Sequence, residues 1–171
     1  PDSTFFQNII AIGCCSASHG FGSQNGNGGL AIGTCAARFA TANILAIGAN
    51  AGCQSSGSQN AFVGVNAGLK NTSGCCNSFF GQQTGQQNTT GCCNTFIGSG
   101  AASGNTTGGA NISLGMCSGP QSLGASGCHN FIGGFKSGSS LTSGSCNILV
   151  GLCAGLSTVS YTHLTLPTII T

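Results

Sequence analysis

The chain has almost no charged side chains. Of its 171 residues only four carry a fixed charge, namely Asp2, Arg38, Lys70 and Lys136, and three more are histidines. A single carboxylate cannot supply the paired acids of acid–base catalysis, a Ser/His/Asp triad or the oxygen cage of a hard cation. We therefore expect no enzyme: no catalytic residues, no cofactor and no metal site. Because three scattered bases form no basic stripe, we also expect no nucleic acid among the partners.

Long hydrophobic runs and proline are scarce as well. No window approaches eighteen consecutive apolar residues, so we expect no membrane span. The chain has three prolines and its glycines do not fall at every third position, which excludes a collagen triple helix. Disorder is excluded too, because 40% of the residues are hydrophobic and the mean hydropathy is positive. Part of the chain must therefore fold.

Glycine and small polar residues are abundant, and they recur with a fixed period. The chain holds 31 Gly, 22 Ser, 16 Thr and 15 Asn. Three segments align without gaps as NAFVGVNAGLKNTSGCC, NSFFGQQTGQQNTTGCC and NTFIGSGAASGNTTGGA, which gives a repeat of 17 residues. Each repeat places a glycine, here called the anchor glycine, after two mostly apolar residues. We assign the anchor to Gly13, Gly33, Gly48, Gly64, Gly81, Gly98, Gly115, Gly133 and Gly151.

This repeat predicts an all-β fold, a parallel β-solenoid (β-roll or β-helix) of about nine coils. The stretches between glycines are only three to five residues long, which is too short for helices but suits short strands joined at sharp corners. Coils stacked about 4.8 Å apart would make a rod roughly 40 Å long. We assign residues 8–157 to this solenoid domain and residues 1–7 to the edge of a fragment.

The last residues abandon the composition of the repeats. Residues 158–168, TVSYTHLTLPT, hold the only tyrosine of the chain and resemble the translation of a transposase adapter used in sequencing libraries. We therefore interpret residues 158–171 as a non-native tail and leave His163 out of any site. The alternative is a short C-terminal strand.

Alternation along each strand predicts which side chains form the core. The residue before the anchor glycine is always apolar, and we expect it to point inward, so that the residue before it points outward. A soluble rod rarely leaves an apolar stripe in water, so we expect Phe62, Phe79, Phe96 and Phe131 to join three copies of the chain. The alternative is that the strand faces are reversed locally or that the rings fold over a corner. The expected core ladder is Ile12, Ile32, Ile47, Val63, Phe80, Ile97, Leu114, Ile132 and Val150.

Asparagine also recurs in columns. Stacked side-chain amides can hydrogen-bond along the rod, so we expect a structural role for Asn60, Asn77, Asn94 and Asn111. Four sequons match an N-glycosylation acceptor, but most of them follow from the repeat itself and therefore carry little weight. These sequons begin at Asn71, Asn88, Asn105 and Asn111.

The twelve cysteines fall into columns too. Cys75 and Cys92 share one column, and Cys76 and Cys93 share the next. Neighbours in a column are near enough for a disulfide, but side chains in register meet at poor angles, which favours small free thiols over obligatory bridges. Zinc binding by these four cysteines is an alternative. Adjacent strand residues point to opposite faces, however, so four thiolates would not converge without a bulge.

The repeats resemble two kinds of surface protein. NTTGCCNTFIG and NAFVGVNAG look like Gly-rich repeats of phage tail fibres and related adhesin-like proteins, and IIAIG, LAIG and ILAIG are similar to head repeats of trimeric autotransporter adhesins. The resemblance covers about residues 8–157, although the unit here is longer than in adhesin heads and richer in cysteine. It implies a non-catalytic, structural and adhesive shaft or head segment, formed as a homotrimer, that displays a binding end for a host-surface glycan or protein receptor. It also implies a location in a virion tail fibre or at the extracellular cell surface.

An ice-binding solenoid is the alternative function. A flat ladder of regularly spaced threonines is the surface that such a protein needs, and two neighbouring columns carry hydroxyl residues. Because adjacent residues point to opposite faces, only one of the two columns can belong to a given surface. The columns are Thr72, Thr89 and Thr106, and beside them Ser73, Thr90 and Thr107.

Overall fold

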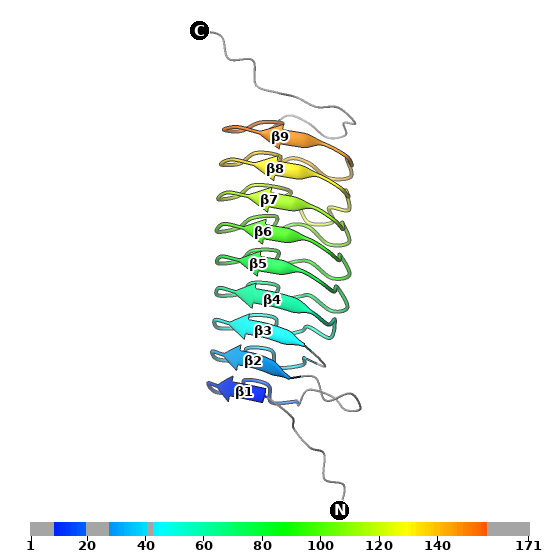
Figure 1. Ribbon diagram of the computed structural model, residues 1–171. Helices are drawn as coiled ribbons and strands as arrows, with labels where there is room; N and C mark the ends of the chain where they lie inside the picture. Colours follow the sequence, from blue (N-terminus) through cyan, green and yellow to red (C-terminus); the bar gives the residue numbers. More distant parts are fainter. Residues whose placement is uncertain (1–8, 20–27, 41–42, 157–171) are drawn as a thin grey trace, which may run out of the picture.

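The computed structural model describes residues 9–19, 28–40 and 43–156 and confirms the predicted parallel β-solenoid with its spacing of roughly 17 residues. Nine short parallel strands stack in chain order into one sheet that runs along the rod (Figure 1). The predicted edge at residues 1–7 and the predicted tail at residues 158–171 lie outside the described residues. The strands are β1 (Ile9–Ile12), β2 (Gly29–Ile32), β3 (Ile44–Ile47), β4 (Asn60–Val63), β5 (Ser78–Phe80), β6 (Thr95–Ile97), β7 (Ile112–Leu114), β8 (Phe131–Gly133) and β9 (Ile148–Val150).

The described part of the chain has no helix long and apolar enough to cross a membrane.

Hydrogen bonds between neighbouring coils hold the solenoid together. Strand residues pair with the equivalent residues of the next coil, as Phe62 does with Phe79 and Phe79 with Phe96. The turns follow the same rule, because Gly81 N–H donates to Val63 O and Gly98 N–H donates to Phe80 O, each at 2.8 Å. Like residues therefore lie over like residues along the rod.

The anchor glycines end the strands, and their backbone requires glycine. Gly81 has φ +136°, and a Cβ atom there would lie 2.6 Å from the carbonyl oxygen of Gly98 in the next coil. The prediction is wrong by one residue in the eighth coil, where the anchor is Gly134 and not Gly133. Gly134 has φ +122° and donates its N–H to Leu114 O, whereas Gly133 lies in β8 beside Leu114. The irregular segment between β7 and β8 lengthens this coil, so counting repeats misplaces its anchor.

The predicted core ladder is wrong in its orientation. The residue two before the anchor points inward and the residue directly before it points outward, the reverse of our expectation for every coil except the eighth. Ile132 is buried as predicted, because the shift of the anchor to Gly134 places it in the inward position. The other predicted members lie on the outside and are exposed or half-buried: Ile12, Ile32, Ile47, Val63, Phe80, Ile97, Leu114 and Val150.

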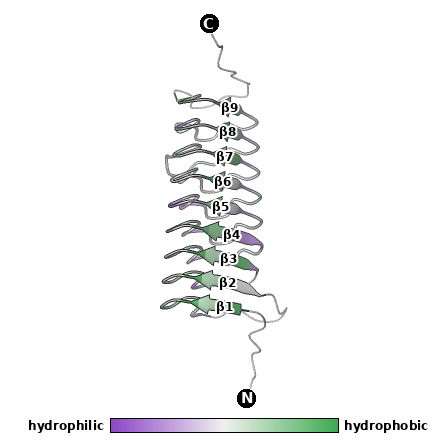
Figure 2. Cartoon of the chain, turned by 60° about the vertical axis from the view of Figure 1, so that its left-hand side comes forward, coloured by the Kyte–Doolittle hydropathy of each residue, from purple (hydrophilic) through white to green (hydrophobic). Residues whose placement is uncertain are grey.

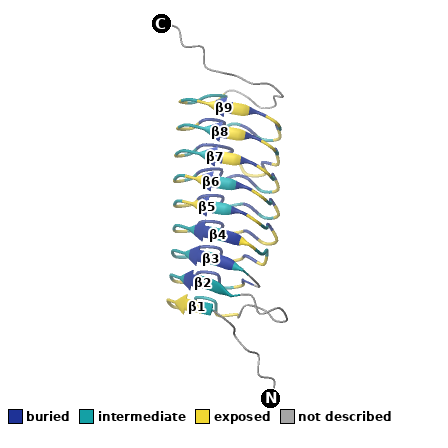
Figure 3. Ribbon diagram, in the orientation of Figure 1, coloured by how far each residue is buried: buried dark blue, intermediate teal, exposed yellow. Residues whose placement is uncertain are grey.

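The true core is a column of residues, here called the inner column, that runs up the sheet side of the rod. Its residues are at most 2% exposed. Two of its phenylalanine rings stack with their centroids 4.8 Å apart and an interplanar angle of 7°, namely Phe79 and Phe96. In Figure 3 much of β3 and β4 has the colour of buried residues, whereas β7, β8 and β9 carry the colour of exposed residues. The inner column is Ala31, Ala46, Phe62, Phe79, Phe96, Ser113, Ile132 and Leu149.

Glycines on the opposite wall make room for two of the three rings of the inner column, whereas Ala102 takes the equivalent place for Phe96. A Cβ atom at Gly85 would lie 2.5 Å from the Phe79 ring, and one at Gly68 would lie 2.6 Å from the Phe62 ring. Opposite the smaller Ala31, alanine takes the equivalent place, as Ala37. The interior is thus filled by a ring against glycine in some coils and by alanine against alanine in others, which is the close packing that a folded core requires.

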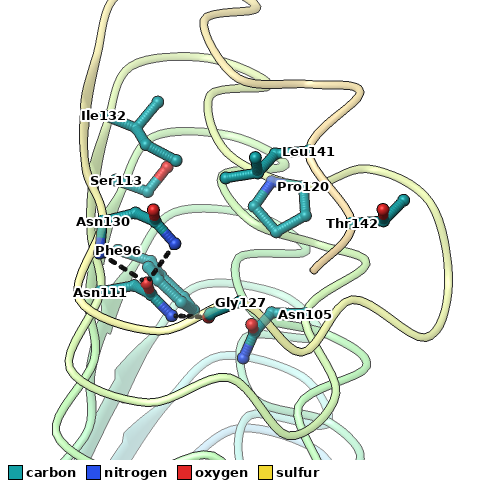
Figure 4. Close-up of a pocket in the computed structure, with 10 residues that line it drawn as sticks. All are labelled: Phe96, Asn105, Asn111, Ser113, Pro120, Gly127, Asn130, Ile132, Leu141 and Thr142. Carbon is teal, nitrogen blue, oxygen red and sulfur yellow. Dashed lines mark hydrogen bonds between the residues drawn. The ribbon is translucent and has the colours of Figure 1, made fainter. Parts of the chain in front are cut away.

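The inner column is interrupted once, in the seventh coil. Ser113 lies there between Phe96 and Ile132, and its hydroxyl is 2.7 Å from that of Ser118 (Figure 4). A small hollow opens beside it, lined also by Pro120 and by buried asparagines such as Asn105 and Asn111.

Two asparagine columns hydrogen-bond along the rod and to backbone groups of the interior, which confirms the predicted bonding of the column that contains Asn60, Asn77, Asn94 and Asn111. Asn94 Oδ1 accepts the backbone N–H of Asn111 at 2.9 Å, and Asn94 Nδ2 donates to Gly108 O at 2.9 Å and to Asn77 Oδ1 at 3.2 Å. In the second column Asn88 Nδ2 donates to Asn71 Oδ1 at 2.7 Å. Because buried polar groups must be hydrogen-bonded, these amides are part of the core rather than of its surface.

Candidate functional site

A continuous surface feature of the described chain is the outward side of the sheet, here called the outer face. It consists of two columns of side chains that alternate with the inner column along each strand. The column before the anchor is Ile12, Ile32, Ile47, Val63, Phe80, Ile97, Leu114, Gly133 and Val150. The other column is Ile10, Leu30, Leu45, Ala61, Ser78, Thr95, Ile112, Phe131 and Ile148.

This outer face exposes large apolar side chains in β1 and in each of β5 to β9, whereas those in β2, β3 and β4 are half-buried. Ile12 is 58% exposed at one end, Ile97 is 45% exposed near the middle and Val150 is 40% exposed at the other end. Figure 2 shows the strands of the first coils coloured as hydrophobic over most of their length. Contiguous apolar patches of this extent are uncommon on monomeric soluble proteins and mark interaction surfaces.

The outer face is also uncharged. Among the residues that the structure describes, no charged side chain belongs to a strand, since Arg38, Lys70 and Lys136 all lie in the turns. Two of the three cations lie over the aromatic ring of their own neighbour, as Lys136 Nζ does at 5.3 Å from the Phe135 centroid. The only hydroxyls on the outer face belong to Ser78 and Thr95. A partner for this face must therefore be apolar rather than ionic.

The predicted oligomer interface is corrected by the reversal of the strand faces. Phe62, Phe79 and Phe96 are fully buried inside the chain, so they cannot contact another copy. Phe131 is 39% exposed and does lie on the outer face, because the displaced anchor of the eighth coil moves it outward. An outward apolar column is therefore present, but most of its residues differ from the predicted ones.

The outer face was missed because alternation alone does not say which of two apolar columns is inside. Two signals in the sequence could have identified it. Asn60 lies two residues before Phe62 and therefore points to the same side of the strand. Because its amide recurs in the following repeats and can stack, that side is expected to face the interior. A glycine also follows six residues after Phe62 and after Phe79, where a ring needs space.

The threonine columns of the ice-binding alternative lie in the turns, and the hydroxyl protons of the first column are engaged. Thr72 Oγ1 donates to Thr89 O, Thr89 Oγ1 to Thr106 O and Thr106 Oγ1 to Ala125 O, each at 3.0 Å. These bonds tie each coil to the next and give the column a structural role. No observation on this column favours ice binding.

The cysteines are free thiols in the described coils, and those of the zinc alternative do not converge. Cys75 lies against Cys92, but Cys76 Sγ instead donates to Gln59 Oε1 at 3.2 Å. Within the described ranges, no group of three or more His, Cys, Asp or Glu residues could hold a metal ion. Cys76 and Cys93 both have positive φ, which turns the chain into the following buried asparagine and separates the two columns.

The four sequons are unsuited to modification in the folded chain. Asn71, Asn88, Asn105 and Asn111 are at most 5% exposed, and their Nδ2 groups donate hydrogen bonds to other coils or turns. A glycan attached to any of them would have to displace these interior bonds.

No protein-family model, no curated protein and no solved structure matches this chain.

Proposed function

We propose that this protein is a non-catalytic structural and adhesive segment, a shaft or head of a viral tail fibre or cell-surface adhesin, in which three copies are joined along their outer faces. The observation that carries the proposal is the uncharged apolar outer face, which runs over nine consecutive coils. Such a segment displays a binding end for a host-surface glycan or protein at a distance from its base. Its work is mechanical, and its place is a virion or the outside of a cell.

The size of the outer face supports association between copies. Eight coil spacings give a length of about 40 Å, and a strand with its flanking residues gives a width of roughly 15 Å, so the face measures about 600 Å². Side-chain relief adds to this value, and the three outer faces of a trimer together would remove about 1,800 Å² or more from water. Other apolar side chains extend the apolar surface further. Examples are Val65 and Leu152, which are exposed just beyond their anchor glycines.

Self-association also suits the periodicity of the face. A second copy has the same spacing between coils, so a ridge such as Phe80 or Ile97 can fit repeatedly between ridges of its neighbour. A cyclic arrangement around one axis uses the same face of every copy and leaves no open apolar edge. A partner with no such period would match only part of the rod.

The experiment that tests the proposal measures the mass of the protein in solution by light scattering, for the native chain and for two variants. We expect three chains for the native protein. Ile97→Lys places an unpaired charge in the centre of the outer face and should weaken association by roughly 100-fold or more. Leu123→Lys adds the same charge at a more exposed apolar residue, 74% exposed, in a turn away from the strands, and should leave the mass unchanged.

Circular dichroism keeps the comparison interpretable, because all three proteins should show the same β spectrum. A single-chain mass for the native protein at every concentration would overturn the proposal. So would equal loss of association in both variants, since that result would mean that general charge repulsion and not the outer face decides it.

A further inference from the structure

One column of the solenoid contains a pair of thiols in direct contact. Cys75, just before β5, and Cys92, just before β6, occupy equivalent places in neighbouring coils (Figure 1). Their Sγ atoms are 2.8 Å apart, and Cys75 donates its thiol hydrogen to Cys92. At the other places of this column the residue is serine, glycine or a single cysteine, so the contact is between the only two thiols that are neighbours there. The column is Ser58, Cys75, Cys92, Gly109, Cys128 and Ser145.

The backbone of the preceding coil fixes the direction of these side chains. The N–H of Cys75 donates to Cys92 Sγ at 3.0 Å, the N–H of Gly109 donates to Cys128 Sγ at 3.3 Å, and the N–H of Cys128 donates to Ser145 Oγ at 3.0 Å. The side chains of Cys92, Cys128 and Ser145 are thus held toward the coil before them. For Cys92 this rotamer places the sulfur beside that of Cys75.

The arrangement meets two distance requirements of a disulfide. Residues in register on neighbouring coils have Cα atoms about 4.8 Å apart, which lies inside the range found for disulfides. The two sulfur atoms need only approach from 2.8 Å to about 2.05 Å. Both cysteines are half-buried and not enclosed, so a small reagent can reach them. The column beside it has no such contact, because Cys76 Sγ is directed to Gln59.

We propose that Cys75 and Cys92 are a modification site, at which exchange with a small-molecule disulfide of the oxidised-glutathione class forms a covalent bridge between two coils. The bridge would close a short loop and fix the register between the fourth and the fifth coil. The proposal concerns a single chain and does not rest on the proposed function.

The exchange balances in two steps. The Cys92 thiolate attacks one sulfur of the reagent, forms a mixed disulfide and releases one thiolate, which takes up the proton that Cys92 lost. Cys75 then loses its proton to solvent and attacks Cys92 Sγ, which forms the protein disulfide and expels the second reagent thiol. Two protein thiols are oxidised and one reagent disulfide is reduced to two thiols.

Cys92 is assigned the first attack because Cys75 ionises with difficulty. The hydrogen bond to Cys92, together with desolvation and the nearby sulfur charge, raises the pKa of Cys75 to about 12. Once Cys92 is in the mixed disulfide, its sulfur is no longer a free thiol beside Cys75 and the resolving attack can follow.

The test uses the folded full-length chain. It is reduced, freed of reductant, incubated with oxidised glutathione, alkylated and digested with chymotrypsin, which cleaves at Phe79 and Phe80 and separates the two cysteines. We expect a cross-linked peptide pair that is about 2 Da lighter than the sum of its free-thiol peptides. Closing this loop should also raise the melting temperature by about 5 to 10 °C.

Two single variants identify the atoms involved. Cys92→Ser should abolish the cross-link, while the matched control Cys93→Ser, one residue along, should retain it. Serine is accepted in this column at Ser58 and Ser145, so the fold should survive, and circular dichroism verifies that it does. Persistence of the cross-link in Cys92→Ser would overturn the proposal. So would a folded native chain that stays fully reduced or that stops at a glutathione adduct.

Discussion

Replacing Phe79 by alanine is expected to lower the free energy of unfolding by about 3 to 5 kcal/mol, because the change removes a buried ring and leaves a cavity facing Gly85. The ring is fully buried and stacks between those of Phe62 and Phe96, 5.2 Å and 4.8 Å away between centroids. Phe80→Ala, at the very next residue, removes the same ring from the outer face. It should cost the single chain less than about 1 kcal/mol.

Urea unfolding followed by circular dichroism measures both values. The chains are compared in the Ile97→Lys background, so that association along the outer face does not stabilise either one. If the two variants lose equal free energy of unfolding, or if Phe80→Ala loses more, the residues directly before the anchor glycines form the core. That result would refute the inner column.

Replacing Asn94 by alanine is expected to lower the free energy of unfolding by about 3 kcal/mol. The change leaves the buried N–H of Asn111 without its acceptor and removes the bonds that Asn94 Nδ2 donates to Gly108 O and Asn77 Oδ1. A buried group left unsatisfied costs about 1 to 3 kcal/mol, and each lost hydrogen bond adds about 1 kcal/mol. Because each coil contacts only its neighbours, the defect should also loosen the coils on both sides.

Thr95→Ala is the matched control, since it changes the adjacent residue on the outer face and should cost less than about 1 kcal/mol. The same urea titration compares the two variants in the Ile97→Lys background. Hydrogen exchange should show faster exchange of the Asn111 amide in Asn94→Ala alone. If Asn94→Ala unfolds at the same urea concentration as Thr95→Ala, the asparagine columns do not hold the coils together as described.

The repeat in the sequence was sufficient to predict the parallel stacking, the spacing of about 17 residues and the use of glycine at the strand ends. It was insufficient to orient the strand. Alternation separates Phe79 from Phe80, but both are large and apolar, so alternation alone does not decide which one is inside. The space that admits the Phe79 ring lies beside Gly85, a residue of the turn whose distance from the ring is a property of the folded coil.

The eighth coil shows why counting residues fails where a coil is irregular. The consecutive glycines Gly133 and Gly134 are both acceptable anchors in the sequence, and only hydrogen bonding to Leu114 distinguishes them. One residue of displacement moves Ile132 to the inside and Phe131 to the outside. The cysteine columns were predicted correctly, but the contact between Cys75 and Cys92 depends on a rotamer that the backbone of the neighbouring coil sets.

Hydroxyl-radical footprinting read by mass spectrometry tests the central claim most directly, because it reports the exposure of each phenylalanine side chain. The coil stacking and the proposed association along the outer face together predict that Phe62, Phe79 and Phe96 resist modification at every protein concentration. Phe80 and Phe131 should react in dilute solution and become protected as the copies assemble. Modification of Phe79 as fast as that of Phe80, or reactivity of Phe80 that never changes with concentration, would contradict the account.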